Sequence, residues 1–592
     1  YEALTIVGGT SGDPVKTATV LTTEVERVRR FGFTEAELAR AKAEVLQNYE
    51  QSAKEKDKIE SSRLAEELIT HHLEGDAAPG VVWEYDFVRK ALPAISVSDI
   101  NGQKGRLTSD PRVRPFSMIL APGATKTPLP SESQLLASLN NARTAKVTPY
   151  AETVTAKTLL PNAPIPGQIT KTTVNQRDGA TTYAFSNGVT VTVKATDFKN
   201  DQILLGGTRY GGSLLYNVPD LPSAQFATGI VGAMGYGAFN PTQLNRLLTG
   251  RNANASLSIT PYYDSVNGAS NVKDFETMLQ LLYLKMTAPR KDEALFKAEI
   301  AQTRSYVATQ RNNPDVFFQA SLYDLLAGGN PYATRTPTTA DVDKVSLTRS
   351  LQIHQERFGN AYGYQFYIVG SIKPETVKPL LAKYLGGLPS RPIKPAFKDR
   401  NVRAPKGKLE KTVRKGTEDK ANIMVMYRNE VPFTPQDDLR MEALSYILEN
   451  KTIEKIREDM GSAYSPYAGG DLRRVPIGNS IVQFVIGATP AQVPAVEKAV
   501  AEISADLREN GPTDADMAKM KATFRQKNRV DLRTNEYWLA RFLSGYADPA
   551  TAEAAATYAQ RSEALNATEI KSAAQKYMNP SNVIQMVMLP GK

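Results

Sequence analysis

Apolar and polar positions along this chain follow a pattern that recurs. Three stretches each carry a Ser, Thr or Asp suited to a helix N-cap, then an amphipathic helical run, a short turn and an apolar run with the spacing of a strand. They lie at residues 94–122, 340–371 and 564–590. A repeated helix–turn–strand ending predicts a chain built from repeated α+β units.

A second repeated signature marks the start of a long helix. Residues 28–43 read VRRFGFTEAELARAKA, and residues 507–522 read LRENGPTDADMAKMKA. Both place a helix-ending glycine two residues before a threonine, and an acidic residue follows three positions later, as in a capping box. A weaker copy occupies residues 288–302. Because cap, spacing and closing strand recur together, we interpret them as an internal repeat.

The first half of a unit is also visible. Residues 182–197 predict a β-hairpin on the Asn187-Gly188 turn, and residues 409–430 predict its looser counterpart. The chain opens with the strand-like run YEALTIVGG, which suggests a lost N-terminal portion. We therefore expect three units. The first, at 1–122, lacks its first half, and complete units follow at 176–392 and 407–592. A linker rich in Pro, Thr, Ala and Ser at 123–175, with a short helix near 131–143, joins the first two, and a short linker at 393–406 joins the last two.

The expected fold class is therefore α+β, with mostly antiparallel sheets covered on one face by helices. A length of 592 residues is too great for one hydrophobic core. The sequence holds no run of eighteen apolar residues, so no membrane span is predicted. The net charge of +10 comes without a dense Lys/Arg run, which favours a solvated surface over a nucleic-acid site.

Residue counts restrict the chemistry of the chain. Cysteine is absent, which excludes disulfides, thiolate metal sites and a cysteine nucleophile, and is compatible with an oxidising compartment. The three histidines are His71, His72 and His354, and none belongs to a His-x-x-Glu-His or His-x-x-x-His pair. A zinc-clamping helix therefore cannot be built from this chain alone. We interpret all three histidines as surface or helix-end residues.

Several longer stretches carry a family resemblance. They are SNGVTVTVKATDFKND (186–201), YGGSLLYN (210–217), LNRLLTGRNANASLSITPYYDS (244–265), GGNPYATRTPT (328–338) and GFTEAELARAKAEVLQNYE (32–50). Together they resemble the pitrilysin/insulinase zinc metallopeptidases, over nearly the whole chain and in the order of the C-terminal portion of a long two-half bacterial member. The resemblance implies repeated LuxS/pitrilysin-like domains that form half of a clamshell. Residues 1–122 would be the C-terminal part of the second domain, 176–392 the third, inactive domain, and 407–592 the fourth.

The same resemblance implies where the zinc belongs. The zinc site of the family lies in its first domain, which this chain does not contain, so the metal would be bound by a missing upstream domain. The aligned helix of the third domain, residues 223–237, has neither His nor Glu. We therefore expect no catalytic residue and no metal site in this chain.

One pair of residues stands out in the expected fourth domain. The run KIREDMGSAYSPYAGG places Arg457 and Tyr464 seven residues apart, as the fourth domain of the family does. In the family these side chains reach across the chamber to the substrate. A guanidinium donates charge-assisted hydrogen bonds to a peptide carbonyl, and a phenol can donate to a developing oxyanion. The alternative without a functional role is a surface arginine and a tyrosine packed near a glycine-rich turn.

The resemblance thus implies the non-catalytic C-terminal portion of a zinc-dependent endopeptidase, which degrades peptides or unfolded segments inside a closed chamber. Its partners would be the missing N-terminal catalytic half, on the same polypeptide or cleaved from it, and the substrate. The rival is a non-enzymatic scaffold or assembly subunit of the same fold. A third, weaker possibility is an open half that binds peptides by strand addition. The absence of cysteine and the exported bacterial members of the family suggest a periplasmic location.

Overall fold

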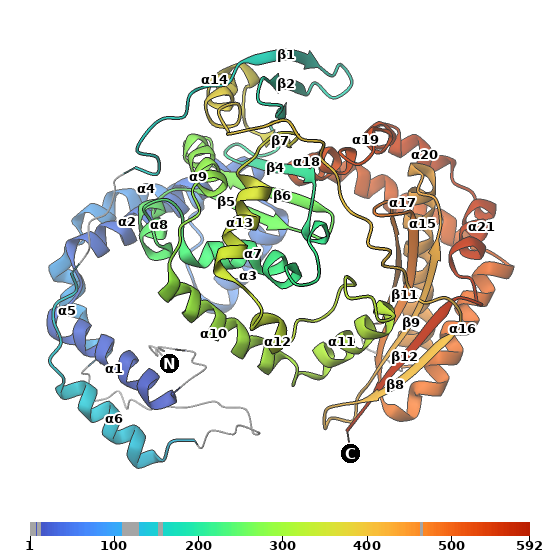
Figure 1. The fold of residues 1–592 in the computed structure, drawn as a ribbon, viewed down its shortest axis with the longest axis horizontal. Coiled ribbons are helices and arrows are strands. Elements are labelled where there is room, and N and C mark those ends of the chain that lie inside the picture. The colour runs from blue at the N-terminus through green and yellow to red at the C-terminus, as the bar shows by residue number, and fades with distance from the viewer. Residues whose placement is uncertain (1–7, 9–12, 109–128, 152–157, 462–465, 592) are drawn as a thin grey trace.

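The computed structural model describes residues 8, 13–108, 129–151, 158–461 and 466–591, and the side chains of 104–108 are not among those described. Two sheets and an N-terminal group of helices make up this part of the chain (Figure 1). We call them the N-terminal helices (residues 14–144), the central unit (169–384) and the C-terminal unit (409–589). Apart from residue 8, the expected opening strand lies outside the described residues, and so does the end of the stretch 94–122, where a closing strand was expected.

The central unit is built on a seven-stranded sheet. Its strand order is β1-β2-β3-β7-β4-β6-β5, and every neighbouring pair is antiparallel except β3 with β7. The predicted hairpin on Asn187-Gly188 forms, as β2 and β3. The strands are β1 (Ile169–Val174), β2 (Thr181–Phe185), β3 (Thr190–Ala195), β4 (Ile203–Tyr210), β5 (Ala253–Ile259), β6 (Tyr263–Ser270) and β7 (Gln365–Gly370). Strand β1 thus lies within the stretch expected to be linker.

The C-terminal unit has a five-stranded sheet in the order β10-β11-β9-β12-β8. Here β8 pairs in parallel with β12, and β12 pairs antiparallel with β9. The hairpin predicted at residues 409–430 is therefore wrong, because the last strand of the chain inserts between its two arms. The strands are β8 (Leu409–Arg414), β9 (Ala421–Glu430), β10 (Tyr467–Arg473), β11 (Asn479–Ala488) and β12 (Val583–Leu589).

The two sheets share one core arrangement. The order β3-β7-β4-β6-β5 in the central unit matches β8-β12-β9-β11-β10 in the C-terminal unit, with the same parallel pair at one end. Strands β1 and β2 are additions to the central unit. The α+β fold class with mostly antiparallel sheets is confirmed, and β8 corresponds to β3 rather than to a whole hairpin.

Helices follow the same order in both units. The central unit has α7 (Leu221–Met234), α8 (Pro241–Leu248), α9 (Phe275–Thr287), α10 (Glu293–Gln310), α11 (Pro314–Ala327), α12 (Thr339–Val342), α13 (Leu347–Phe358) and α14 (Pro374–Tyr384). The C-terminal unit has α15 (Pro435–Thr452), a π-helix (Ile453–Asp459), α16 (Val493–Glu509), α17 (Asp514–Asp531), α18 (Asn535–Gly545), α19 (Pro549–Ala556), α20 (Tyr558–Ala564) and α21 (Ala567–Tyr577). The capping box predicted at Thr513 forms with Asp516. Most of these helices bury their apolar sides against the sheet of their own unit.

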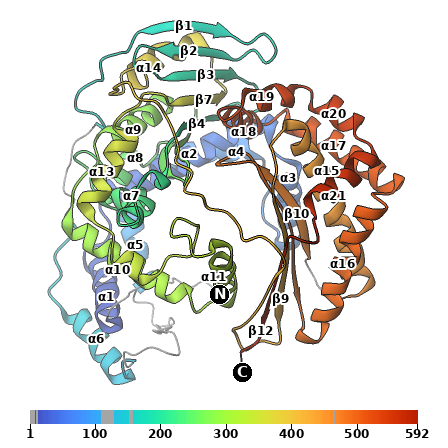
Figure 2. The same ribbon diagram turned by 45° about the vertical axis from the view of Figure 1, so that its right-hand side comes forward.

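Two helices cross to the other unit instead. Helix α18 lies on the face of the central sheet that α9 does not cover, and α11 lies on the corresponding face of the C-terminal sheet (Figure 2). The alternation of side chains along a strand separates the two faces. On β7, Phe366 and Ile368 belong to the core of the central unit, whereas Tyr367 and Val369 pack against α18. Each unit therefore covers part of the open sheet face of the other.

A buried ion pair supports the central sheet at the end of β4. The Arg209 guanidinium donates to Asp264 at 2.9 Å, and neither side chain has exposed area. Arg209 also donates to the carbonyl of Asn360 at 2.7 Å and lies 4.4 Å from the ring centroid of Tyr364. Asp264 accepts a further hydrogen bond from the backbone of Gly212 at 3.0 Å. These bonds tie β4, β6 and the loop after α13 together.

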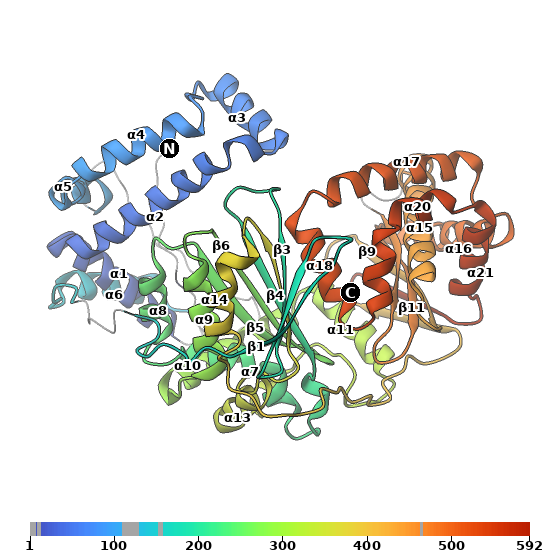
Figure 3. The same cartoon turned by 90° about the horizontal axis from the view of Figure 1, so that it is seen from above.

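The N-terminal helices lie to one side of the sheets (Figure 3). They are α1 (Pro14–Phe31), α2 (Glu35–Lys54), α3 (Ser61–Glu74), α4 (Val81–Ala91), α5 (Val97–Thr108) and α6 (Glu132–Thr144), and α6 is the helix predicted near 131–143. The capping box predicted at Thr34 forms with Glu37. At its C-terminal end α2 meets the central unit, where Lys54 Nζ lies 3.0 Å from Asp201 Oδ2.

Candidate functional site

Arg457 lies on the π-helix that continues α15. The apolar face predicted for this segment is buried, since Leu444, Ile447, Leu448 and Ile456 have 1% exposure or less. The π-helical turn changes the angular spacing of side chains, and such turns are frequent at functional sites. Next to the buried Ile456, the Arg457 side chain is 49% exposed. The local fold thus turns this guanidinium toward solvent.

The contact made by Arg457 is a weak one. Its Nη2 lies 3.5 Å from Glu458 Oε1, on the adjacent residue of the chain, and that carboxylate is itself 56% exposed. A long, solvated pair of this kind contributes little and does not fix the side chain. The guanidinium therefore remains able to donate to a group from outside the chain.

Tyr464, the second predicted site residue, lies outside the described residues, which resume at Pro466. Strand β10 begins at Tyr467 and forms one edge of the C-terminal sheet. An edge strand has unpaired backbone donors and acceptors, to which an extended peptide can add as a further strand. Tyr467, Gly469 and Gly470 all belong to this strand.

The helix expected to correspond to a zinc helix is α7. Its residues between Leu221 and Met234 include no His, Asp or Glu, and most of them are buried. Nowhere in the described ranges do three or more His, Asp or Glu side chains gather as a metal site would need. A zinc ion therefore does not fit the donor groups of the described part of this chain, and no catalytic step is assigned to them through a metal.

The histidines divide into two kinds. His71 and His72 are exposed in the last turn of α3, as expected. His354 differs from the expectation, because it lies fully buried within α13. Its ring packs near Phe358 and Tyr236, with centroid distances of 5.2 and 6.2 Å. Burial lowers the pKa of His354 to about 4, so the ring is neutral and structural at physiological pH.

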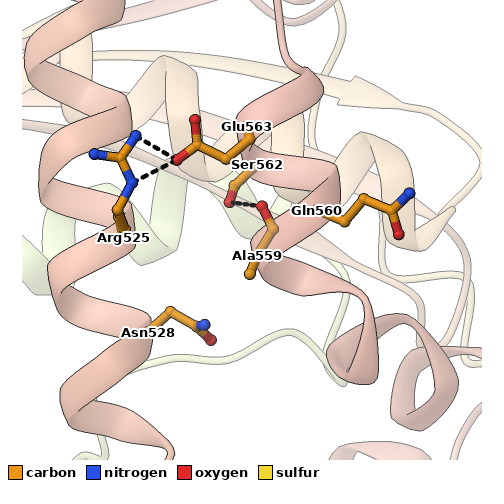
Figure 4. Close-up of a pocket in the computed structure, with 6 residues that line it drawn as sticks. All are labelled: Arg525, Asn528, Ala559, Gln560, Ser562 and Glu563. Atoms are coloured by element: carbon orange, nitrogen blue, oxygen red, sulfur yellow. Dashed lines mark hydrogen bonds and ion pairs between the residues drawn. The ribbon is translucent and has the colours of Figure 1, made fainter.

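A small surface pocket lies between α17 and α20 (Figure 4). Arg525 pairs with Glu563 at 2.8 Å across it, and Ser562 donates to the carbonyl of Ala559 at 3.0 Å. Arg525 and Glu563 thus neutralise each other, and the Ser562 hydroxyl bonds within its own helix, so these three side chains offer no catalytic arrangement.

The described residues contain no helix both long and apolar enough to cross a bilayer.

Sequence comparison places the chain among peptidase relatives. Residues 344–524 match the family model for the peptidase M16 inactive domain. A protein of Arabidopsis thaliana described as a zinc protease PQQL-like is 25% identical over 545 residues, which are 88% of this chain and 53% of that protein. The chain thus spans about half the length of this curated relative.

Solved structures show the same fold. A mutant of the ferredoxin protease FusC, in complex with Arabidopsis ferredoxin, has a TM-score of 0.70 at 16% identity over 97% of this chain and 63% of that chain. The periplasmic protease PqqL of Escherichia coli has a TM-score of 0.66 at 15% identity over the same shares. The separately solved first half of PqqL also superposes, with a TM-score of 0.55 at 15% identity over 72% of this chain and 93% of that one.

Proposed function

We propose that this chain is the non-catalytic C-terminal portion of a zinc endopeptidase of the M16 family, in line with its resemblance to pitrilysin and insulinase. The observation that carries the proposal is the match of residues 344–524 to the inactive domain of that family. The relative that is called a zinc protease is about twice as long as the matched part, which leaves room for a catalytic half.

In this proposal the chain forms one wall of a closed chamber that admits peptides or unfolded segments. The second half of the molecule would be an upstream domain pair, on the same polypeptide or cleaved from it, that holds the zinc. The assignment of residues 1–122, 176–392 and 407–592 to second, third and fourth domains is part of the proposal. So is a periplasmic location, which is supported by the periplasmic neighbour PqqL.

Arg457 and Tyr464 would bind the substrate from this wall. Arg457 has an exposed guanidinium with a weak partner, so it can donate to a peptide carbonyl without losing a strong bond. It lies shortly before the edge strand β10, along which an extended substrate could run. Tyr464 would donate its hydroxyl to the oxygen of the scissile carbonyl. Its role rests on its spacing from Arg457 and on the family resemblance.

The test compares this chain with the longer natural polypeptide that contains it. Both are purified, their metal content is measured by mass spectrometry, and their cleavage of an unstructured fluorogenic peptide is followed. We expect zinc and cleavage in the longer polypeptide and neither in this chain alone. A chain that alone binds one zinc tightly and cleaves the peptide would overturn the assignment.

The same experiment separates the rival functions. A longer polypeptide without His-x-x-Glu-His, without zinc and without cleavage would favour the scaffold or assembly subunit. Binding of the uncleaved peptide by this chain, lost when β10 is disrupted, together with no zinc and no cleavage in a longer polypeptide, would favour an open peptide-binding half. Each of these outcomes contradicts the peptidase proposal.

A further inference from the structure

The helices that cross between the two units share one sequence pattern. Helix α11 packs on the C-terminal sheet through pairs of adjacent residues that recur every four positions (i, i+1, i+4, i+5, i+8 and i+9). These residues are Phe317, Phe318, Ser321, Leu322, Leu325 and Leu326. Helix α18 packs on the central sheet through the first four of these spacings, with Trp538, Leu539, Phe542 and Leu543. These spacings place two adjacent apolar rows on one helix face. The pattern gives a helix a wide apolar face that can pack on a sheet, and α15 carries it on the sheet of its own unit, so the place of a helix in the repeat must decide which sheet it covers.

Both crossing helices also occupy the same place in the repeat. Each follows the long helix that begins at the repeated cap, which is α10 for α11 and α17 for α18. In the N-terminal helices the long helix with this cap is α2, and the next α-helix is α3. Helix α3 therefore has the place in the repeat that the crossing helices α11 and α18 have in theirs.

The sequence of α3 carries the crossing pattern as well. Counted from Leu64, the same six positions of α3 are occupied by Leu64, Ala65, Leu68, Ile69, His72 and Leu73, so five of the six are apolar. In contrast to α11 and α18, this face is open to solvent. The side chains of Leu64, Leu68, Ile69 and Leu73 are 44, 62, 58 and 75% exposed. An apolar face of this kind on a soluble chain marks an interaction site.

We propose that α3 docks on the open face of a β-sheet in the upstream half of the molecule, as α11 and α18 dock on the two sheets of this chain. The proposal rests on the proposed function for the existence of that half. The surface that α3 would meet is a row of alternate apolar side chains on a central strand. The precedents are Tyr367 and Val369 on β7, and Ile584, Met586 and Met588 on β12.

Two observations indicate that the partner of α3 is the upstream half. The described side chains of the N-terminal helices that are buried are Glu26, Ser138 and Ala142, so the apolar residues of these helices lack a core in this part of the chain. The first half of PqqL superposes on most of this chain, so an upstream half of that kind supplies sheets of the required architecture. A second copy of this chain is disfavoured, because the sheet faces that would accept α3 are already covered by α11 and α18.

The absence of cysteine makes the proposal directly testable. Leu68→Cys places a single thiol on the exposed face of α3, and Val530→Cys places a matched thiol on α17, where the native side chain is 50% exposed. The rate of maleimide labelling is measured for each variant in this chain alone and in the longer natural polypeptide, with upstream cysteines replaced by serine. We expect labelling of the Leu68→Cys variant to slow by about tenfold or more in the longer polypeptide, since reaction then requires opening of a packed interface. Labelling of the Val530→Cys variant should stay unchanged.

A charge on the same face provides a second readout. Leu68→Asp should lower the melting temperature of the longer polypeptide by several degrees and leave that of this chain almost unchanged, because the side chain is exposed here. Equal labelling of the Leu68→Cys variant in both contexts would overturn the proposal. So would protection in this chain alone that disappears on dilution, which would identify a second copy as the occupant.

Failure of the docking proposal and failure of the peptidase proposal give different results. If the longer polypeptide protects the Leu68→Cys thiol but holds no zinc, the docking of α3 is supported and the proposed peptidase activity is contradicted. If it cleaves peptide while this thiol stays fully reactive, the peptidase activity is supported and the docking of α3 is contradicted.

Discussion

The ring of Phe542 stacks on the ring of Tyr367, with centroids 5.8 Å apart and planes 7° from parallel. Phe542 belongs to α18 of the C-terminal unit, and Tyr367 to β7 of the central unit. Aromatic stacking inside a buried cluster adds to the free energy gained from area burial. The contact therefore helps to hold the two units together as one body.

Phe542→Ala is expected to destabilise the chain by about 3 kcal/mol, since truncating a buried phenylalanine loses its transfer free energy and leaves a cavity. The free energy of unfolding is measured by urea titration with intrinsic fluorescence. Val530→Ala on α17 is the matched control and should shift it by about 0.5 kcal/mol or less, because Val530 is exposed. Equal destabilisation by the two changes would contradict the role of α18 as a joint between units.

The buried pair Arg209–Asp264 predicts an asymmetric response to substitution. Arg209→Met removes the guanidinium and leaves the fully buried Asp264 with the longer contact to Arg357 at 3.5 Å and the backbone bond from Gly212, at a cost of about 3 kcal/mol. The double variant Arg209→Met with Asp264→Asn should recover part of this loss, because the buried charge that lost a partner is then gone. Urea titrations of the wild type, both single variants and the double variant give the coupling free energy. A coupling of zero would show that the pair is energetically irrelevant.

His354 predicts a dependence of stability on pH. Burial lowers its pKa to about 4 in the folded chain, whereas in the unfolded chain the ring titrates near its ordinary value of about 6.5. Protonation therefore favours the unfolded state. The contribution of neutral His354 is fully present above about pH 6.5 and decreases as the pH falls toward 4, by up to about 3 kcal/mol.

The measurement for His354 is the free energy of unfolding at pH 7.5 and at pH 5. Carboxylates also titrate in this window, so the informative quantity is the difference between wild type and His354→Leu, which keeps an apolar side chain beside Phe358. We expect the variant to lose less stability on acidification than the wild type. Parallel pH profiles for the two proteins would contradict a titrating role for His354.

Local chemistry explains which parts of the fold were predictable from the sequence. The capping boxes at Thr34 and Thr513 and the hairpin at Asn187-Gly188 depend on residues within a few positions, and all three form. The hairpin at residues 409–430 does not form, because β12 contributes the pairing partner from the far end of the chain. Alternation identifies a strand but does not encode which other strand lies beside it.

The candidate site shows the same limit. The exposure of Arg457 follows from the apolar spacing of Leu444, Ile447 and Ile456, which the sequence contains. The π-helix that carries Arg457 has no comparable periodic signal. The crossing of α11 and α18 was not predicted either, because an amphipathic helix pattern gives the width of the apolar face and not the identity of the sheet it contacts.

The proposed substrate-binding pair is tested in the longer polypeptide that contains the zinc half. Tyr464→Phe removes one hydroxyl, and we expect kcat to fall by about 10²-fold, the usual loss for a hydrogen-bond donor to a developing oxyanion. Arg457→Ala should raise KM as well, because the guanidinium is proposed to hold a substrate carbonyl in the ground state. Peptide cleavage kinetics on both variants are the measurement. Lys455→Ala on the same π-helix and Tyr446→Phe on α15 are the matched controls.

Melting curves decide whether lost activity reflects a lost contact with substrate or a damaged fold. Arg457 is half exposed and its contact to Glu458 is long and solvated, so Arg457→Ala should change the free energy of unfolding by about 0.5 kcal/mol or less. A packing role would instead lower kcat and the melting temperature together. Turnover at the wild-type level in Tyr464→Phe would refute the catalytic contribution of the hydroxyl. Because Lys455 carries a similar charge on the same turn, an equal loss in Lys455→Ala would assign the effect to general electrostatic attraction of the substrate rather than to directed hydrogen bonds from Arg457.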